Sequence, residues 1–137
     1  MANLTAPRAM QRGDGVIRPY KVGAVDVFAG ALVSVVQATG FAQRSGDTSG
    51  HKFVGVADKN VKNSTGAAGS KKVRVWARGV FPFACTGADQ TWTGQKVYAV
   101  DDQTVALAAT TTNDVLVGVV TEVVSATQVF VALTPDS

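Results

Sequence analysis

The stretch Phe53-Val54-Gly55-Val56 decides the fold, because it returns later in the chain as Leu116-Val117-Gly118-Val119. In both stretches a glycine interrupts a run of apolar and β-branched residues. Such residues favour strands, since a branched β-carbon fits a pleated sheet better than a helix turn. A glycine inside a strand marks a bulge or the close approach of another backbone. The two stretches therefore predict two equivalent bends in an all-β protein.

The repeated pattern extends on both sides of these glycines. Gly30 precedes the first strand pair as Gly94 precedes the second, and the distance to the following strand glycine is 25 residues in one copy and 24 in the other. Each copy ends in an alternating strand, at residues 73–77 and at residues 129–133. The copies differ chiefly in the polar loop 58–70, which we expect to carry contacts specific to the first copy.

Turn-forming residues divide the 137-residue chain at intervals of roughly 8 to 12 residues, which is typical of a sandwich or barrel. Val and Thr are abundant, 46% of the residues are apolar, and 17% are charged. We expect an all-β fold: a single small β-barrel or sandwich, β-tulip-like, built from two similar strand sets over residues 22–137. Pro82 indicates an edge strand or a bend. The expected strands are 31–37, 41–42, 52–57, 72–78, 80–83, 96–100, 104–107, 115–124 and 127–133.

Residues 1–21 differ from the rest of the chain, because they contain two prolines and show no sustained period of 2 or 3.6 residues. We expect an extended arm, which a partner could order; the alternative is that it packs along its own barrel. The segment carries a net charge of +3 and the remaining residues are neutral overall. A neutral body argues against direct nucleic-acid binding, whereas the arm suits an acidic protein surface. The basic residues of the arm are Arg8, Arg12, Arg18 and Lys21.

The sequence offers no convergent set of catalytic groups, so we expect a protein that is not an enzyme and holds no cofactor or metal. Cys85 is the only cysteine and is expected to be a small buried residue. His51, the only histidine, lies in a polar loop and is expected to be solvated. The pair Asp101-Asp102 is expected to form a turn. We predict no membrane contact and no secretion, since no stretch resembles a membrane span or a signal peptide.

Alternation over residues 72–78 places the polar side of a half-buried strand at Lys72, Arg74, Trp76 and Arg78. Trp and Arg are enriched at protein interfaces. Packing of Trp76 under the 58–70 loop, or a sugar site, are the alternatives. Together with the arm, this face gives the predicted contact residues for a partner, which are Arg8, Arg12, Arg18, Lys21, Arg74, Trp76 and Arg78.

The order of these elements resembles one protein family over roughly residues 22–133. The matching segments are Gly30-Ala31-Leu32-Val33, Phe53-Val54-Gly55-Val56-Ala57, Val75-Trp76-Ala77-Arg78-Gly79-Val80-Phe81, Gly94-Gln95-Lys96-Val97-Tyr98, Leu116-Val117-Gly118-Val119-Val120 and Val129-Phe130-Val131-Ala132-Leu133. The family is that of the bacteriophage capsid cement or decoration proteins of the DUF2190-like group. The resemblance lies in the order and spacing of the whole series and not in any single motif.

The resemblance implies a virion structural protein, made in the host cytoplasm, that sits on the outer capsid surface of a tailed-phage head. Its expected partners are the major capsid protein, at junctions between capsid subunits, and further copies of itself, with a homotrimer favoured and a homodimer as the alternative. Its expected role is capsid stabilisation. A carbohydrate-binding or host-surface adhesion module, using Trp76, Trp92 and Tyr98 as stacking platforms, is the alternative function.

Overall fold

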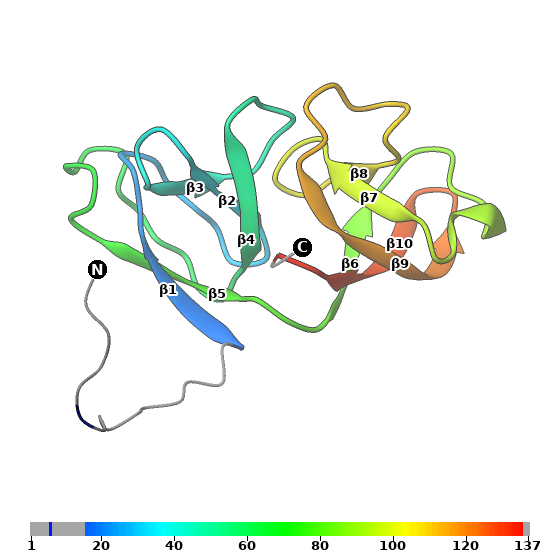
Figure 1. The fold of residues 1–137 in the computed structure, drawn as a ribbon, viewed down its shortest axis with the longest axis horizontal. Helices are drawn as coiled ribbons and strands as arrows, with labels where there is room; N and C mark the ends of the chain where they lie inside the picture. The colour runs from blue at the N-terminus through cyan, green and yellow to red at the C-terminus, as the bar shows by residue number, and fades with distance from the viewer. Residues whose placement is uncertain (1–5, 7–15, 136–137) are drawn as a thin grey trace.

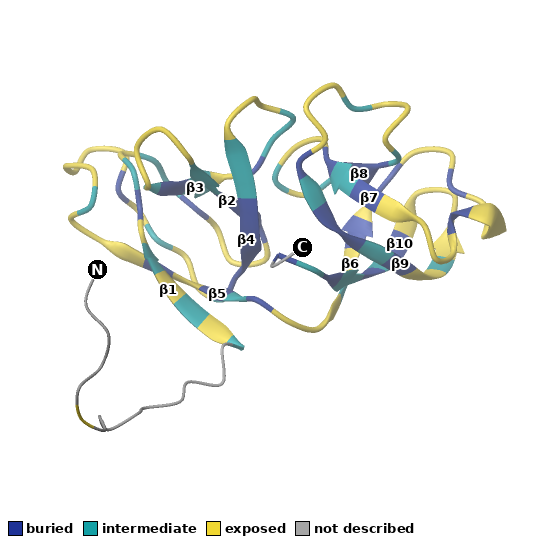
Figure 2. Cartoon of the chain, viewed as in Figure 1, coloured by how far each residue is buried: buried dark blue, intermediate teal, exposed yellow. Residues whose placement is uncertain are grey.

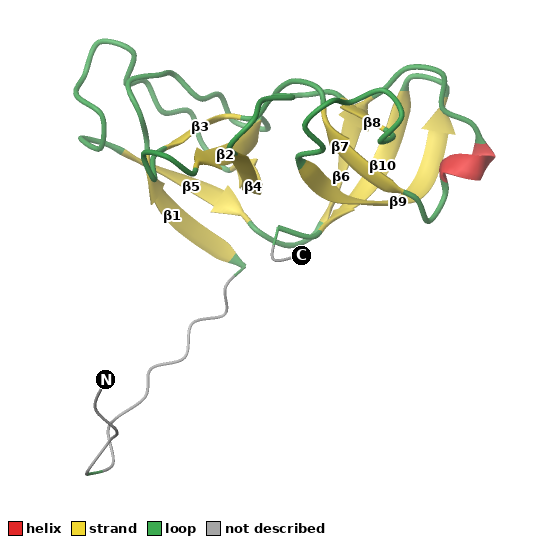
Figure 3. Ribbon diagram, turned by 45° about the horizontal axis from the view of Figure 1, so that its top comes forward, coloured by secondary structure: helices red, strands yellow, loops and turns green. Residues whose placement is uncertain are grey.

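A computed structural model of the chain describes residue 6 and residues 16–135. These residues form strands joined by loops, with a single turn of 3-10 helix, η1, at Gln90–Trp92 (Figure 3). The predicted all-β class is confirmed. The strands are β1 (Ile17–Lys21), β2 (Leu32–Val36), β3 (Ala42–Arg44), β4 (His51–Ala57), β5 (Lys72–Trp76), β6 (Val80–Ala84), β7 (Lys96–Ala99), β8 (Val105–Ala106), β9 (Leu116–Ser125) and β10 (Gln128–Leu133).

The strands form two five-stranded antiparallel sheets that lie side by side along the long axis of the molecule (Figure 1). The first sheet has the order β1-β5-β4-β2-β3 and the second has the order β6-β10-β9-β7-β8. Adding five to each strand number of the first sheet gives the strand order of the second sheet. Each predicted strand set therefore forms a sheet of its own. Parallel bridges between Val22 and Ala42, and between Ala84 and Thr104, draw the two ends of each sheet together.

The N-terminal boundary of the sheet region lies earlier than predicted. Ile17–Lys21 pairs with β5 as an edge strand, which brings Ile17 opposite Trp76 and Lys21 opposite Lys72. The predicted arm 1–21 is therefore too long, and its last five residues follow the alternative in which the segment packs along its own body. The remainder of the predicted arm lies outside the described residues, apart from residue 6.

The new strand β1 extends the repeat, because β1 is the counterpart of β6. Both strands carry a proline at their third position, Pro19 in one and Pro82 in the other. Proline has no N–H to donate to a ladder, so it is tolerated at a sheet edge. Both strands occupy the edge of their sheet, as Pro82 predicted for β6.

The two glycine bends are confirmed as equivalent irregularities. The ladder between β2 and β4 passes over Val54, and the ladder between β7 and β9 passes over Val117. A β-carbon on Gly55 would lie 2.9 Å from Val75 Cγ2 and closer still to a backbone carbonyl oxygen of β5. A β-carbon on Gly118 would meet Val131 Cγ1 at 2.9 Å and a carbonyl oxygen of β10 in the same way. Glycine is thus required at both sites, because the backbone of the neighbouring strand lies too close for a β-carbon.

The hydrophobic core has two parts, one inside each sheet (Figure 2). The second part also takes in Leu32, Phe53 and Val56, which come from the outer face of the first sheet. The two sheets are therefore packed against one another through these residues. The fully buried valines of the inner faces are Val22, Val27, Val33, Val73 and Val75 in the first sheet, and Val97, Val105, Val117, Val120, Val129 and Val131 in the second.

The connection between β4 and β5 is the main difference between the copies, as the sequence predicted. In the first copy, residues 58–71 form a long loop, whereas β9 and β10 are joined by a short turn. The side chain of Asn63, 1% exposed, holds this loop to the sheet. Its amide donates to the carbonyl oxygens of Gly23 and Ala67 at 2.9 and 3.0 Å, and its oxygen accepts from the Ser70 hydroxyl.

Candidate partner-binding face

The outer face of β1 and β5 gathers the basic and aromatic side chains that the sequence singled out. In this antiparallel pair, directly opposite residues share a face. Lys21 lies opposite Lys72, and the next outward position of β5 is Arg74. Trp76 follows, at the end of β5. We call Lys21, Lys72, Arg74 and Trp76 the basic face.

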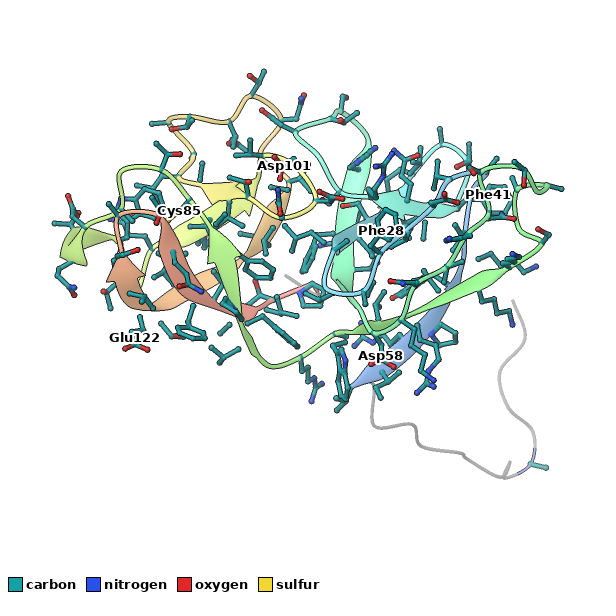
Figure 4. All side chains as sticks on the ribbon, turned by 180° about the vertical axis from the view of Figure 1, so that it is seen from behind. Phe28, Phe41, Asp58, Cys85, Asp101 and Glu122 are labelled. Atoms are coloured by element: carbon teal, nitrogen blue, oxygen red, sulfur yellow. The ribbon has the colours of Figure 1, made fainter. Side chains whose placement is uncertain are left out.

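The position of Trp76 is fixed by the start of the 58–71 loop. Its indole N–H donates to the carboxylate of Asp58 at 3.1 Å, and the backbone N–H of Asp58 donates to the carbonyl oxygen of Arg74 at 2.9 Å. Figure 4 shows Asp58 beside β1 and β5. Trp76 is half-buried, so it packs against the body and still offers part of its ring to a partner.

The structure brings together three of the seven predicted contact residues, Lys21, Arg74 and Trp76. Arg18 lies on the other face of β1, opposite Val75, and is half-buried. Arg78 is exposed in the connection that follows β5. The remaining two, Arg8 and Arg12, lie outside the described residues.

Lys72 was missing from the predicted set, although the sequence carries its signal. It occupies the same alternating strand as Arg74 and Trp76, two residues before Arg74. The alternation placed Lys72 on the polar side of this strand, but the predicted contact residues did not include it. Lys21 was predicted as a contact residue because of its charge in the N-terminal segment. Its position beside Lys72 depends on the pairing of β1 with β5.

The basic face has no counterpart in the second sheet. The positions equivalent to Lys21, Lys72 and Arg74 are occupied by Ala84, Gln128 and Phe130, as the matching strand registers show. The two copies thus share a backbone but present opposite surface chemistry. This contrast points to a role for the charges that the fold itself does not require.

A cleft of about 300 Å³ lies between the first sheet and the β7–β8 turn, and His51 and Ser45 line it. His51 is half-buried rather than simply solvated: its Nε2 lies 3.2 Å from the Gln43 amide, and its buried Nδ1 has no hydrogen-bond partner. Burial lowers the pKa of this imidazole. The Ser45 hydroxyl is bound to Ser34 instead of His51, so the two are not arranged as a nucleophile and its base.

The other groups considered for chemistry have structural positions. Cys85 is 5% exposed, its thiol lies 3.7 Å from the Ala126 carbonyl oxygen, and burial raises its pKa. Asp101 accepts from the backbone N–H groups of Gln103 and Thr104 at 2.9 and 2.8 Å, which confirms it as a turn former. Within residues 16–135, no three potential metal-ligating side chains come together.

In the part of the chain that the structure describes, no helix has the length and apolar character to cross a membrane. Comparison of the chain with models of known protein families, with curated proteins and with solved structures gives no match.

Proposed function

We propose that this chain is a virion structural protein, a capsid cement protein that binds the outer surface of a tailed-phage head at junctions between major capsid protein subunits. The observation that carries the proposal is the basic face, a row of cations around an oriented tryptophan on one sheet only. The strand series that resembles the cement proteins supplies the class of partner. The basic face would contact acidic groups on the capsid subunits.

The physical demands of such a role fit the described body. A cement protein stabilises a shell by burying surface against several subunits at once, and many weak contacts then act together. It needs a rigid body and no catalytic group. The two sheets provide this body, since side chains of the first sheet complete the core of the second. We propose that the cations of residues 1–21 add a second contact on a neighbouring subunit, and that neither nucleic acid nor membrane is a partner.

No specific observation favours the alternative function, a carbohydrate-binding or adhesion module. It relies on three aromatic side chains acting together, but Trp92 is only 8% exposed and belongs to the core of the second sheet. Tyr98 lies in β7 of the second sheet, whereas Trp76 lies in β5 of the first. The alternative therefore retains Trp76 as its one candidate platform.

The test is a binding assay with heads of the encoding phage that lack this protein. The variant Lys72→Glu/Arg74→Glu reverses two charges on the basic face, and Lys59→Glu/Arg44→Glu reverses the same residue types elsewhere. We expect the first variant to bind heads at least about tenfold more weakly and the control to bind like the unaltered protein. The unaltered protein should also raise the temperature at which heads release DNA.

Two results would contradict the proposal. Heads that fail to bind the unaltered protein would remove the capsid as partner, and binding to a glycan array would then favour adhesion. Equal loss of binding in both variants would show that net charge matters and the basic face does not. Circular dichroism of each variant separates a binding defect from a folding defect.

A further inference from the structure

The outer face of the second sheet carries apolar side chains that are exposed or half-buried. Its side chains alternate with the inward-pointing valines of β9 and β10. Val80, on the edge strand, is 53% exposed. We call this surface the apolar face; its main members are Val80, Pro82, Leu116, Val119, Phe130 and Ala132.

The matching surface of the first sheet shows what this backbone arrangement can pack against. Leu116 and Val119 are half-buried, whereas their counterparts in the first sheet, Phe53 and Val56, are 0% and 3% exposed. The first-sheet residues are covered because the second sheet packs on them. The outer face of this strand arrangement is therefore buried by a second sheet in the first copy and remains partly exposed in the second copy.

We infer that the apolar face binds the same face of a second copy of this chain, as a two-fold dimer. Two charged side chains accompany the apolar residues: Lys96, opposite Val119, and Glu122, opposite Phe130. Glu122 points away from the ribbon (Figure 4). The two charges are about 10 Å apart along β9, so a two-fold axis between them would set each Lys96 over the partner's Glu122.

This charge arrangement favours a second copy over an unrelated partner, because one cation and one carboxylate on an apolar surface are self-complementary under a two-fold axis. A standard interface takes roughly 800 Å² from each partner, about a tenth of this chain's surface of 8035 Å². Face-to-face packing of two sheets is a common way to bury such an area. A two-fold pair would replace the trimer that the family resemblance favours.

Sedimentation equilibrium of the full chain and three charge variants tests the inference. Lys96→Glu sets like charges together at both pairs, as does Glu122→Lys, and each should weaken dimerisation on the order of tenfold. The charge swap Lys96→Glu/Glu122→Lys restores opposite charges and should return the dimer constant to within about threefold of the original. Lys72→Glu, on the first sheet, is the matched control and should leave the dimer unchanged.

Val80→Lys provides a second, independent variant, because it adds a charge to the apolar face at an exposed position without altering the core. It should abolish the dimer and leave the melting temperature of the monomer nearly unchanged. A chain that remains monomeric at submillimolar concentration overturns the inference, as does a charge swap that fails to restore what the single reversals lose. The inference does not rest on the capsid proposal, since the capsid assay uses charges on the other sheet.

Discussion

The hydroxyl groups of Ser34 and Ser45 lie 2.7 Å apart and form a hydrogen bond inside the protein, where the two residues are 0% and 4% exposed. Replacing either serine by alanine leaves the other hydroxyl buried without this partner. We expect each single variant to lower the free energy of unfolding by about 1–3 kcal/mol, and Ser34→Ala/Ser45→Ala to lose less than the sum. Urea unfolding measures all three; strictly additive losses would contradict the expectation.

Alanine at Gly55 or Gly118 should destabilise the fold, because the added β-carbon would collide with the neighbouring strand. We expect a loss of about 2 kcal/mol or more at each site, the cost of overpacking a site bounded by backbone. Gly23→Ala is the control, since its β-carbon would find its nearest neighbour at 3.7 Å. If thermal unfolding gave equal losses for Gly23 and Gly55, the close approach would not be the cause.

Asn63→Asp keeps the acceptor for Ser70 but removes the amide that donates to two backbone carbonyl oxygens. We expect a loss of about 2–4 kcal/mol and faster hydrogen exchange across residues 58–71. Asn60→Asp is the matched control, because Asn60 only accepts a hydrogen bond, from the Ala29 N–H. Exchange that speeds up equally over the second sheet would show that Asn63 supports the whole fold.

Acid should weaken the connection between the two sheets at Asp47. Its carboxylate accepts from the backbone N–H groups of Thr112 and Asn113 at 2.9 and 2.8 Å, and these bonds lower its pKa. Its stabilisation is therefore complete above the unfolded pKa, about 3.9, and is lost as pH falls through the lower folded value. Melting temperatures across this pH range should fall less steeply for Asp47→Asn than for the unaltered chain.

The carboxylates of Asp26 and Asp89 contribute to acid sensitivity in the same direction, since hydrogen bonds lower the pKa of both. The Asp47→Asn variant should therefore keep part of the acid transition. If it kept the full slope, Asp47 would not act as a connection between the sheets. Asp102→Asn, at a carboxyl group without these backbone bonds, serves as the control.

Trp76→Phe keeps an aromatic ring on the basic face and removes the N–H that binds Asp58. We expect a loss of stability of about 1 kcal/mol, the net value of one such hydrogen bond. Asp58→Asn retains an oxygen that can accept the same bond, so it should lose less. A Trp76→Phe variant as stable as the unaltered chain would show that the bond does not hold the ring in place.

Much of the fold could be predicted from the sequence because its strongest signals are local. The pattern around Gly55 and Gly118 identified two equivalent strands, and alternation at residues 73–77 and 129–133 identified the strand that follows each of them. Pro82 indicated an edge strand. These features depend on neighbouring residues, which a single sequence displays directly.

The missed parts depend on contacts between residues distant in the chain. Strand β1 has little alternating pattern of its own, and it becomes a strand because β5 offers an unpaired edge. The basic face was recognised on β5, but its extension to Lys21 needed that pairing. The partial burial of His51 likewise depends on neighbours in space, among them Gln43 of β3, which no local pattern reports.

The contribution of three first-sheet side chains, Leu32, Phe53 and Val56, to the core of the second sheet has a consequence for synthesis. The first sheet encloses its own valines, whereas the core of the second sheet is completed by these three side chains of the first. Domains generally fold as they leave the ribosome, N-terminal part first. The first sheet should thus fold while the second is still being translated and serve as its template, so that the order of the two copies along the gene matches the order in which they depend on each other.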